Sequence, residues 1–338
     1  MNTAVNETGE QNIRGLMDSF NRAITGLRTE VRKVIVGQEE VVDHLLITLL
    51  VGGHCLITGM PGTAKTLLVK TLADALGLSF KRIQFTPDLM PTDITGTDII
   101  DEDQATGKRV WTFIPGPLFA NVVLADEINR TPPKTQAALL EAMQERSITV
   151  RGHRHILEKP FLVLATQNPI ELEGTYPLPE AQLDRFLFNV ILDYLSADDE
   201  FKVVDRFTNS VESPEATACT NAEEILKFQW LTRQVPVAEN VSRYAVNLVR
   251  ATRPADPLAS DKVRKYIKFG ASVRATMAIT LAAKARALLE GRYHVAHEDI
   301  KAIAPSVLRH RMLANYHAES DGVTVDDVLK DLIAQLPE

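Results

Sequence analysis

The chain has 338 residues, of which 45% are hydrophobic and 24% are charged, as in ordinary globular proteins. At about 150 residues per domain, this length suggests two domains. The net charge of −7 gives no electrostatic support for nucleic-acid binding, and the two cysteines exclude a disulfide framework. The polar, acidic start lacks a signal-peptide pattern, and the longest apolar run is far shorter than the ~18 residues of a membrane span. We therefore expect a soluble, cytoplasmic protein without nucleic acid as a partner.

Helices and strands alternate in the first part of the chain. Apolar residues recur every three or four positions over residues 13–35, which predicts an amphipathic helix, and a second helix is expected over 39–51. Short apolar runs predict strands at 54–58, 80–85, 121–125, 160–166 and 186–192, with helices at 65–76 and 135–145 between them. Strands separated by helices predict an α/β fold with a mostly parallel sheet that is covered on both faces.

Two segments interrupt this alternation, and the pattern changes after residue 193. Residues 97–113 and 147–157 each resemble a hairpin around a glycine-containing turn. Beyond 193 only helices are expected, near 240–252, 273–289, 298–311 and 325–336, and the small polar residues of 208–223 indicate a mobile loop. We place a domain boundary near residue 194, which gives a core of 1–194 with an N-terminal helix and a helical domain of 195–338.

A phosphate-binding loop is predicted by GMPGTAKT at 59–66, which lies between an apolar strand and a helix. Small residues let backbone N–H groups approach phosphates at a helix N-terminus. Lys65 would reach the β- and γ-phosphates, and the hydroxyl of Thr66 would ligate Mg²⁺. The strict pattern has Gly before the Lys, whereas Ala64 stands here. A position that needs a positive φ would resist Ala.

Polar side chains end the strands that follow. Asp126 and Glu127 follow NVVLA, and these carboxylates would hold Mg²⁺ and polarise the attacking water, respectively. Asn168 ends the next strand and could bond the γ-phosphate and the water. Each has an ordinary alternative, namely a solvated strand end for the pair and a local turn before Pro169 for Asn168. Arg185, just before the last strand, would alone indicate a surface ion pair.

Several long strings in order carry a family resemblance. GMPGTAKT, LADEINR, LATQNP and EGTYPLPEAQLDRF are similar to the MoxR group of AAA+ ATPases. The similarity is dense from about residue 36 to 193 and looser beyond, where it includes GASVRA, YHVAHEDI and VLRHRM. It implies an AAA+ core with a five-stranded parallel sheet in the order 5-1-4-3-2 and a C-terminal all-α lid. Residues 97–113 would be the helix-2 insert and 147–157 the pre-sensor-1 hairpin.

The resemblance also implies roles for single residues. Asn168 would be sensor 1, Arg274 sensor 2, and Arg185 the arginine finger that acts on nucleotide in a neighbouring subunit. Ala64 is common in this group, but Val273 stands where the group usually has Pro, which bears on how firmly Arg274 is aimed. The nucleotide, ATP or ADP, would be bound by residues near the adenine and in the loop: Val36, Gly37, Gln38, Gly59, Met60, Pro61, Gly62, Thr63, Ala64, Lys65, Thr66 and Leu67.

The implied function is Mg²⁺-dependent ATP hydrolysis by a ring, typically a hexamer, coupled to chaperone-like remodelling or maturation of a client protein. The group often works with a partner that bears a von Willebrand factor A domain, and often in metal-cofactor insertion. Three alternatives stay open: a metal-chelatase motor subunit, a nucleic-acid motor or loader, and a scaffold that binds ATP but barely hydrolyses it. No residue pattern identifies the client.

Overall fold

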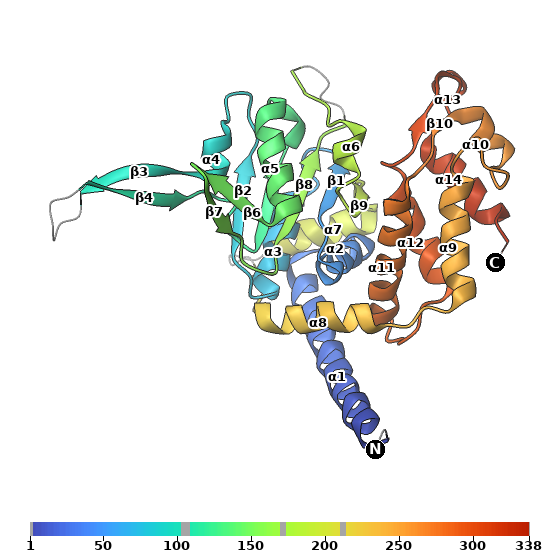
Figure 1. Ribbon diagram of the computed structural model, residues 1–338, viewed down its shortest axis with the longest axis horizontal. Helices are drawn as coiled ribbons and strands as arrows, with labels where there is room; N and C mark the ends of the chain where they lie inside the picture. Colours follow the sequence, from blue (N-terminus) through green and yellow to red (C-terminus); the bar gives the residue numbers. More distant parts are fainter. Residues whose placement is uncertain (1–2, 103–108, 170–173, 210–213, 338) are drawn as a thin grey trace.

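A computed structural model of the protein describes residues 3–102, 109–169, 174–209 and 214–337. In Figure 1 the parallel sheet and the helices that cover it form the left part of the molecule, and the C-terminal helices form the right part. The long N-terminal helix α1 leaves the base of the molecule, and a two-stranded hairpin projects from the far edge of the sheet. No helix in the described part of the chain is long and apolar enough to cross a membrane.

The central sheet has five strands in the order β2-β5-β8-β1-β9, and every pairing is parallel. In chain order these strands are numbers 2, 3, 4, 1 and 5, so the predicted order 5-1-4-3-2 is confirmed. The strands and helices of this layer are β1 (Cys55–Gly59), β2 (Phe80–Gln84), β5 (Val122–Asp126), β8 (Leu162–Gln167), β9 (Phe188–Leu192), α1 (Thr3–Val34), α2 (Glu39–Val51), α3 (Lys65–Ala75), α5 (Pro133–Glu145) and α6 (Glu180–Leu183).

Continuous apolar runs form the central strands because both faces of the sheet are covered. Along β5, Val122 and Leu124 belong to the core cluster that includes α1, α2 and α3, whereas Val123 and Ala125 belong to the cluster that includes α5. This alternation is the period of two expected for a strand between two layers. The parallel pairing of the strands places their carboxyl ends along one edge, where open α/β sheets bind ligands.

Both predicted hairpins are present. The first pairs β3 (Gly96–Glu102) with β4 (Arg109–Pro115) after a short helix, α4 (Pro91–Thr95), and its tip at 103–108 lies outside the described residues. The second pairs β6 (Ser147–Val150) with β7 (His153–Ile156). The two touch each other, because Phe113 stacks on His155 with ring centroids 3.8 Å apart and the Arg151 guanidinium lies 4.0 Å from the centroid of Trp111.

The C-terminal part is helical, as predicted, and adds one short antiparallel pair, β10 (Ile267–Phe269) with β11 (Leu313–Ala314), which the helical pattern does not reveal. Its helices are α7 (Ala197–Thr208), α8 (Ala222–Gln234), α9 (Glu239–Ala251), α10 (Asp261–Tyr266), α11 (Val273–Leu289), α12 (His297–Leu308), α13 (Tyr316–Asp321) and α14 (Val325–Gln335). We call this part the lid; α8 lies across its junction with the core, against α1, α2 and α11 (Figure 1).

The predicted mobile loop at 208–223 is wrong for its later residues. The Thr217 N–H donates to Oε2 of Glu30 on α1 at 3.0 Å, and the Cys219 N–H donates to the Ala75 carbonyl at the end of α3 at 2.8 Å. These bonds hold the segment against the core. Small polar residues allowed this path but did not predict it, since the partners lie far away in the sequence.

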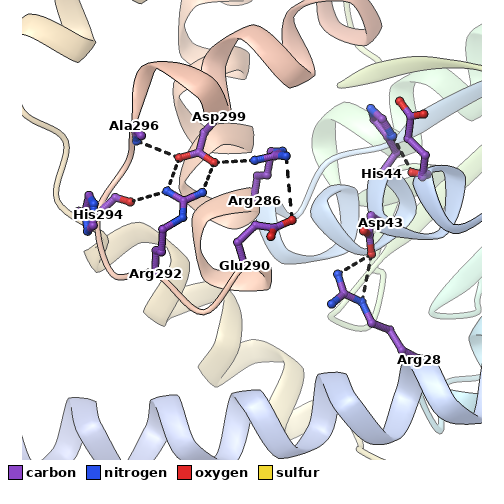
Figure 2. A network of polar contacts seen from close by, with 10 residues as sticks. Arg28, Asp43, His44, Arg286, Glu290, Arg292, His294, Ala296 and Asp299 are labelled. Carbon is purple, nitrogen blue, oxygen red and sulfur yellow. Dashed lines mark hydrogen bonds and ion pairs between the residues drawn. The ribbon is translucent and has the colours of Figure 1, made fainter.

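A buried ion-pair network fixes the middle of the lid. Figure 2 shows Asp299 accepting hydrogen bonds from the side chains of Arg286 and Arg292 and from the backbone N–H of Ala296. The Asp299 side chain is fully buried. A buried carboxylate needs such partners, because an unpaired charge away from water is costly. The network therefore joins α11, the turn after it and the start of α12.

Candidate nucleotide-binding site

The loop between β1 and α3 has the backbone of a phosphate-binding loop. A Cβ on Gly59 would lie 2.7 Å from the carbonyl oxygen of Leu192 on β9, so only glycine fits there. Gly62 has φ +82° and Ala64 has φ +58°, both in the left-handed region. Position 64 thus has the positive φ that an alanine resists, and Ala64 adopts it at a cost of roughly 1–2 kcal/mol.

Lys65 bends back over this loop. Its Nζ donates to the carbonyl oxygens of Gly59 at 2.8 Å and Met60 at 2.7 Å, and the Thr63 hydroxyl also donates to the Met60 carbonyl. Burial lowers the pKa of Lys65, while Asp126 and Glu127 act in the opposite direction. The ammonium group is thus held beside the loop by backbone carbonyls, and not by an ion pair with any carboxylate that the structure describes.

The loop and the strand ends surround one cavity of about 410 Å³, which we call the loop cavity. It brings together residues predicted from three separate strings of the sequence. Its lining consists of Pro61, Gly62, Thr63, Ala64, Lys65, Thr66, Leu67, Asp126, Glu127, Thr166, Gln167 and Asn168. Gly59 and Met60 contribute through their carbonyls instead. The parallel sheet produces this convergence, because β1, β5 and β8 are neighbours.

Asp126 is held by two residues that the sequence did not single out. Its Oδ1 accepts from the Thr166 hydroxyl at 2.6 Å, and its Oδ2 accepts from Nε and Nη2 of Arg82 at 3.0 and 2.7 Å. Asp126 is only 7% exposed, so these bonds are what stabilise its charge. Both oxygens of the carboxylate therefore have fixed directions.

Glu127 has its own partners. Its backbone has φ +57°, an unusual value for a non-glycine residue and one that clusters at functional sites. The backbone N–H donates to the Thr166 hydroxyl at 2.8 Å, and Oε2 accepts from Gln84 at 2.8 Å and from Arg130 at 3.0 Å. Thr166 thus connects the two carboxylate residues, and Gln84 and Arg130 hold the side chain of Glu127.

A second cavity of about 310 Å³ adjoins the first, and we call it the α7 cavity. The two cavities share Gly62, Thr63, Ala64 and Leu67. The rest of its lining is mostly apolar and comes from the segment before α2, the end of β9 and α7: Val34, Ile35, Val36, Gln38, Asp193, Tyr194, Leu195, Glu200, Val203, Val204 and Phe207. Val36 and Gln38, which the resemblance places near the adenine, line this cavity, and Gly37 lines a neighbouring polar cavity between α1 and α2.

Arg185 and Arg274 are not among the residues that line the loop cavity. Arg185, in the turn between α6 and β9, donates from Nη1 to the Leu140 carbonyl at 2.9 Å and lines a separate cavity beside α5. Nη1 of Arg274 lies 3.6 Å from Oδ2 of Asp184, the residue before Arg185. The structure therefore brings Arg274 to the turn at residues 184–187, which carries Arg185 and which we call the arginine turn, and not to the phosphate loop of the same chain.

The departure at Val273 leaves the start of α11 intact. The Ser272 hydroxyl accepts from the Arg274 N–H at 3.2 Å, and the helix begins at Val273, as predicted. Val273 is itself 67% exposed. The cap places Arg274 in the first turn without the help of a proline.

The donor set of the loop cavity fits Mg²⁺. The Thr66 hydroxyl and the Asp126 carboxylate line the same cavity, and both are hard oxygen ligands of the kind that Mg²⁺ prefers. Bound there, the ion would supply charge neutralisation between phosphate oxygens.

Two family models match the sequence. The one described as the ATPase family associated with various cellular activities (AAA) matches residues 54–188, and the one described as an AAA lid domain matches residues 260–332. Both matches agree with the parallel sheet, the loop cavity and the helical C-terminal part. Fold and site thus define the class: an AAA ATPase with a helical lid.

Similar proteins narrow this class to one family. The chain is 42% identical to Chaperone MoxR1 of Mycobacterium tuberculosis, over 96% of this chain and 84% of that protein. It is 31% identical to Protein MoxR of Methylorubrum extorquens, over 88% of this chain and 89% of that protein. A solved structure from Cytophaga hutchinsonii, described as an ATPase, has 40% identity and a TM-score of 0.88 over 98% of both chains. The chain therefore belongs to the MoxR family of AAA+ ATPases, as its motifs predicted.

Proposed function

We propose that this chain hydrolyses ATP with Mg²⁺ as a subunit of a ring, typically a hexamer, and uses the reaction to remodel a client protein. The observation that carries the ATPase proposal is the joining of two cavities at the N-terminus of α3. The mostly apolar α7 cavity suits a base, and the loop cavity suits the phosphates. A nucleoside triphosphate has an apolar base and charged phosphates, so it matches both cavities, which share lining residues in the loop.

Each residue of the loop cavity has a role in this proposal. Lys65 supplies positive charge to the phosphates, and Thr66 and Asp126 hold Mg²⁺. Glu127 accepts a proton from the attacking water, and the amide of Asn168 orients that water against the γ-phosphate. Gln84 and Arg130 hold the Glu127 carboxylate until the substrate is in place.

The positions of Arg185 and Arg274 support a shared site. Neither lines the loop cavity of its own chain, and Arg274 contacts Asp184, the residue before Arg185. We therefore assign both to the nucleotide of a neighbouring subunit, where a cation would stabilise charge in the transition state. A closed ring supplies such a neighbour to every subunit.

A chaperone role rests on the relatives and on one surface. The Mycobacterium tuberculosis relative is named a chaperone. The projecting β3–β4 hairpin exposes Ile100 at 55% and Trp111 at 58%, and we assign client contact to such apolar side chains. We also propose two properties that are typical of the family. One is a partner protein that bears a von Willebrand factor A domain, and the other is a role in metal-cofactor insertion.

Nucleotide titrations and turnover measurements test the ATPase proposal. We expect Lys65→Ala to abolish binding of a fluorescent ATP analogue, whereas Lys70→Ala, an exposed lysine on the same helix, should bind normally. Glu127→Gln should bind ATP and turn over about 10²-fold more slowly. Wild-type affinity in Lys65→Ala, or wild-type turnover in Glu127→Gln, would reject the assignment. The Glu127→Gln protein also serves as a trap for clients, captured with and without ATP.

Mixing two inactive variants tests the shared site. A ring of Arg185→Ala and Lys65→Ala subunits places an intact Arg185 beside an intact phosphate loop, so activity should return. Energy transfer between labelled subunits shows independently that they exchange. If exchange occurs and activity stays absent, the assignment of Arg185 to a neighbour's nucleotide is wrong.

A further inference from the structure

The turn directly after α12 carries the string Arg309-His310-Arg311, which the site described above does not use. Arg311 is nearly buried, with 4% of its side chain exposed. Its guanidinium has five N–H donors, and each has an acceptor: Oδ1 and the carbonyl of Asp184, and the carbonyls of Phe186, Leu187 and Val307. Four of these five acceptors belong to the residues on either side of Arg185.

The neighbours of Arg311 reach the same turn. The Nε2 atom of His310 lies 3.1 Å from the Phe186 carbonyl, and burial lowers the pKa of His310 well below its usual value, so the ring is neutral and Nε2–H donates. Nη1 of Arg309 donates to the Asn189 carbonyl at 2.8 Å. One tripeptide of the lid thus binds the backbone at 184, 186, 187 and 189. We call residues 309–311 the lid clamp.

The clamp fixes the backbone of the arginine turn and leaves its functional side chain accessible. Residue 185 is exposed, although Phe186 and Leu187 beside it are buried. Asp184 adds a second link, because Oδ1 accepts from Arg311 at 2.7 Å while Oδ2 faces Arg274 at 3.6 Å. The turn that carries Arg185 is therefore tied to the turn after α12 and to the start of α11, and its position follows the lid.

We propose that Arg311 is a positioning residue for Arg185: it transmits the position of one subunit's lid to the arginine that this subunit presents to its neighbour's nucleotide. The proposal rests on the shared site of the proposed function. A displacement of about 1 Å at a reacting centre can cost ~10²-fold in rate. Small lid movements, passed through rigid carbonyl contacts, are thus sufficient to switch hydrolysis in the next subunit.

The test is a mixing experiment with Arg311→Met. Alone, this variant should bind the fluorescent ATP analogue normally and hydrolyse ATP ~10²-fold more slowly, with KM within about twofold of wild type. Mixed with Lys65→Ala, it should regain activity, because its intact phosphate loop then receives an Arg185 held by an intact clamp. A variant whose own phosphate loop was damaged could not be rescued in this way.

Arg292→Met is the matched control. Arg292 also pairs with a carboxylate inside the lid, that of Asp299 (Figure 2). Its hydrogen-bond acceptors in the described part of the chain are Asp299 and the His294 carbonyl, both outside the arginine turn. Its loss should lower the midpoint of thermal unfolding and leave kcat per folded ring within about twofold of wild type. An equal loss of kcat in Arg292→Met would show that general lid stability, not the clamp, governs hydrolysis.

The pair Arg185→Ala and Lys65→Ala separates the two proposals. If that pair regains activity and Arg311→Met with Lys65→Ala does not, the clamp is wrong and the shared site stands. If neither pair regains activity although subunits exchange, the shared site is wrong and the clamp with it. Should Arg311→Met fail to fold, His310→Leu, which removes only the donor to Phe186, must show the same pattern of lower kcat and recovery in mixed rings.

Discussion

The guanidinium of Arg82 lies on the carboxylate of Asp126, with Nη2 2.7 Å and Nε 3.0 Å from Oδ2. The two residues come from adjacent parallel strands, β2 and β5. We assign the Asp126 carboxylate to Mg²⁺. The Arg82 guanidinium and Mg²⁺ would therefore compete for the same carboxylate. Arg82 is half-exposed, so water screens part of its charge.

Arg82→Met should therefore lower the Mg²⁺ concentration that gives half-maximal binding of a fluorescent ATP analogue. A charge-assisted hydrogen bond contributes about 1.5–3 kcal/mol, and after discounting for exposure we expect roughly a tenfold shift. Lys81→Met removes a charge from the exposed position just before Arg82 on β2, and it should change this Mg²⁺ concentration little. A higher Mg²⁺ requirement in Arg82→Met would mean that Arg82 orients Asp126 rather than competing for it.

Thr166→Val should destabilise the protein and slow hydrolysis together. The Thr166 hydroxyl is buried; it donates to Asp126 and accepts from the Glu127 N–H. Valine therefore leaves the buried Asp126 carboxylate and the partly buried Glu127 N–H without this partner. We expect a loss of about 2 kcal/mol in the free energy of unfolding and at least a ~10-fold lower kcat. Thr232→Val is the control, because that buried hydroxyl donates only within α8, to Phe228. Equal effects of both substitutions would contradict a special role for Thr166.

Ala64→Gly should stabilise the protein without changing its affinity for ATP. Glycine removes roughly 1–2 kcal/mol of strain at φ +58° and loses about 0.4–1 kcal/mol through the entropy of the unfolded chain. The net gain is about 0–1.6 kcal/mol, measured by urea unfolding. Gly62→Ala is the reverse case, since a Cβ there meets nothing within 4 Å and only φ +82° opposes it. A stabilising Gly62→Ala would show that strain does not govern this loop.

The sequence predicted the sheet and the phosphate-binding loop because both depend on local patterns. Residues 59–66, 126–127 and 168 each follow an apolar strand, and parallel strands place their carboxyl ends at one edge. Arg82 and Gln84 could not be predicted in this way. On β2 they resemble an exposed, solvated face, and only the pairing of Gln84 with Asp126 across the sheet reveals their partners.

The lid clamp and the anchored segment at 217–219 escaped prediction for the same reason. Arg311 is separated from Phe186 by 125 positions, and Thr217 from Glu30 by 187. Side chains that bond backbone carbonyls leave no pattern at either end of the contact. The pair β10–β11 was missed because strands of three and two residues are too short for a period to be visible.

The last prediction concerns pH and His54. Its Nδ1 accepts from the Val163 N–H at 3.0 Å, so Nε2 carries the proton and donates to the Met143 carbonyl at 3.1 Å. Complete burial lowers the pKa of His54 to about 4, whereas an unfolded histidine titrates near ~6.5. The unfolded chain therefore binds more protons between these values, and stability is present above pH ~6.5 and lost as the pH falls toward 4. From pH 7 to 5 this one group should cost about 2 kcal/mol.

Urea unfolding at pH 7 and pH 5 measures this cost. His54→Asn is less stable at pH 7, because asparagine cannot reach both partners, but its further loss on acidification should be about 2 kcal/mol smaller than that of wild type. Burial also lowers the pKa values of His44 and His310, and both remain in the variant, so the difference isolates His54. His153→Asn, at an exposed position of β7, should keep the wild-type pH dependence. Parallel pH profiles for wild type and His54→Asn would show that this ring does not set the acid sensitivity of the fold.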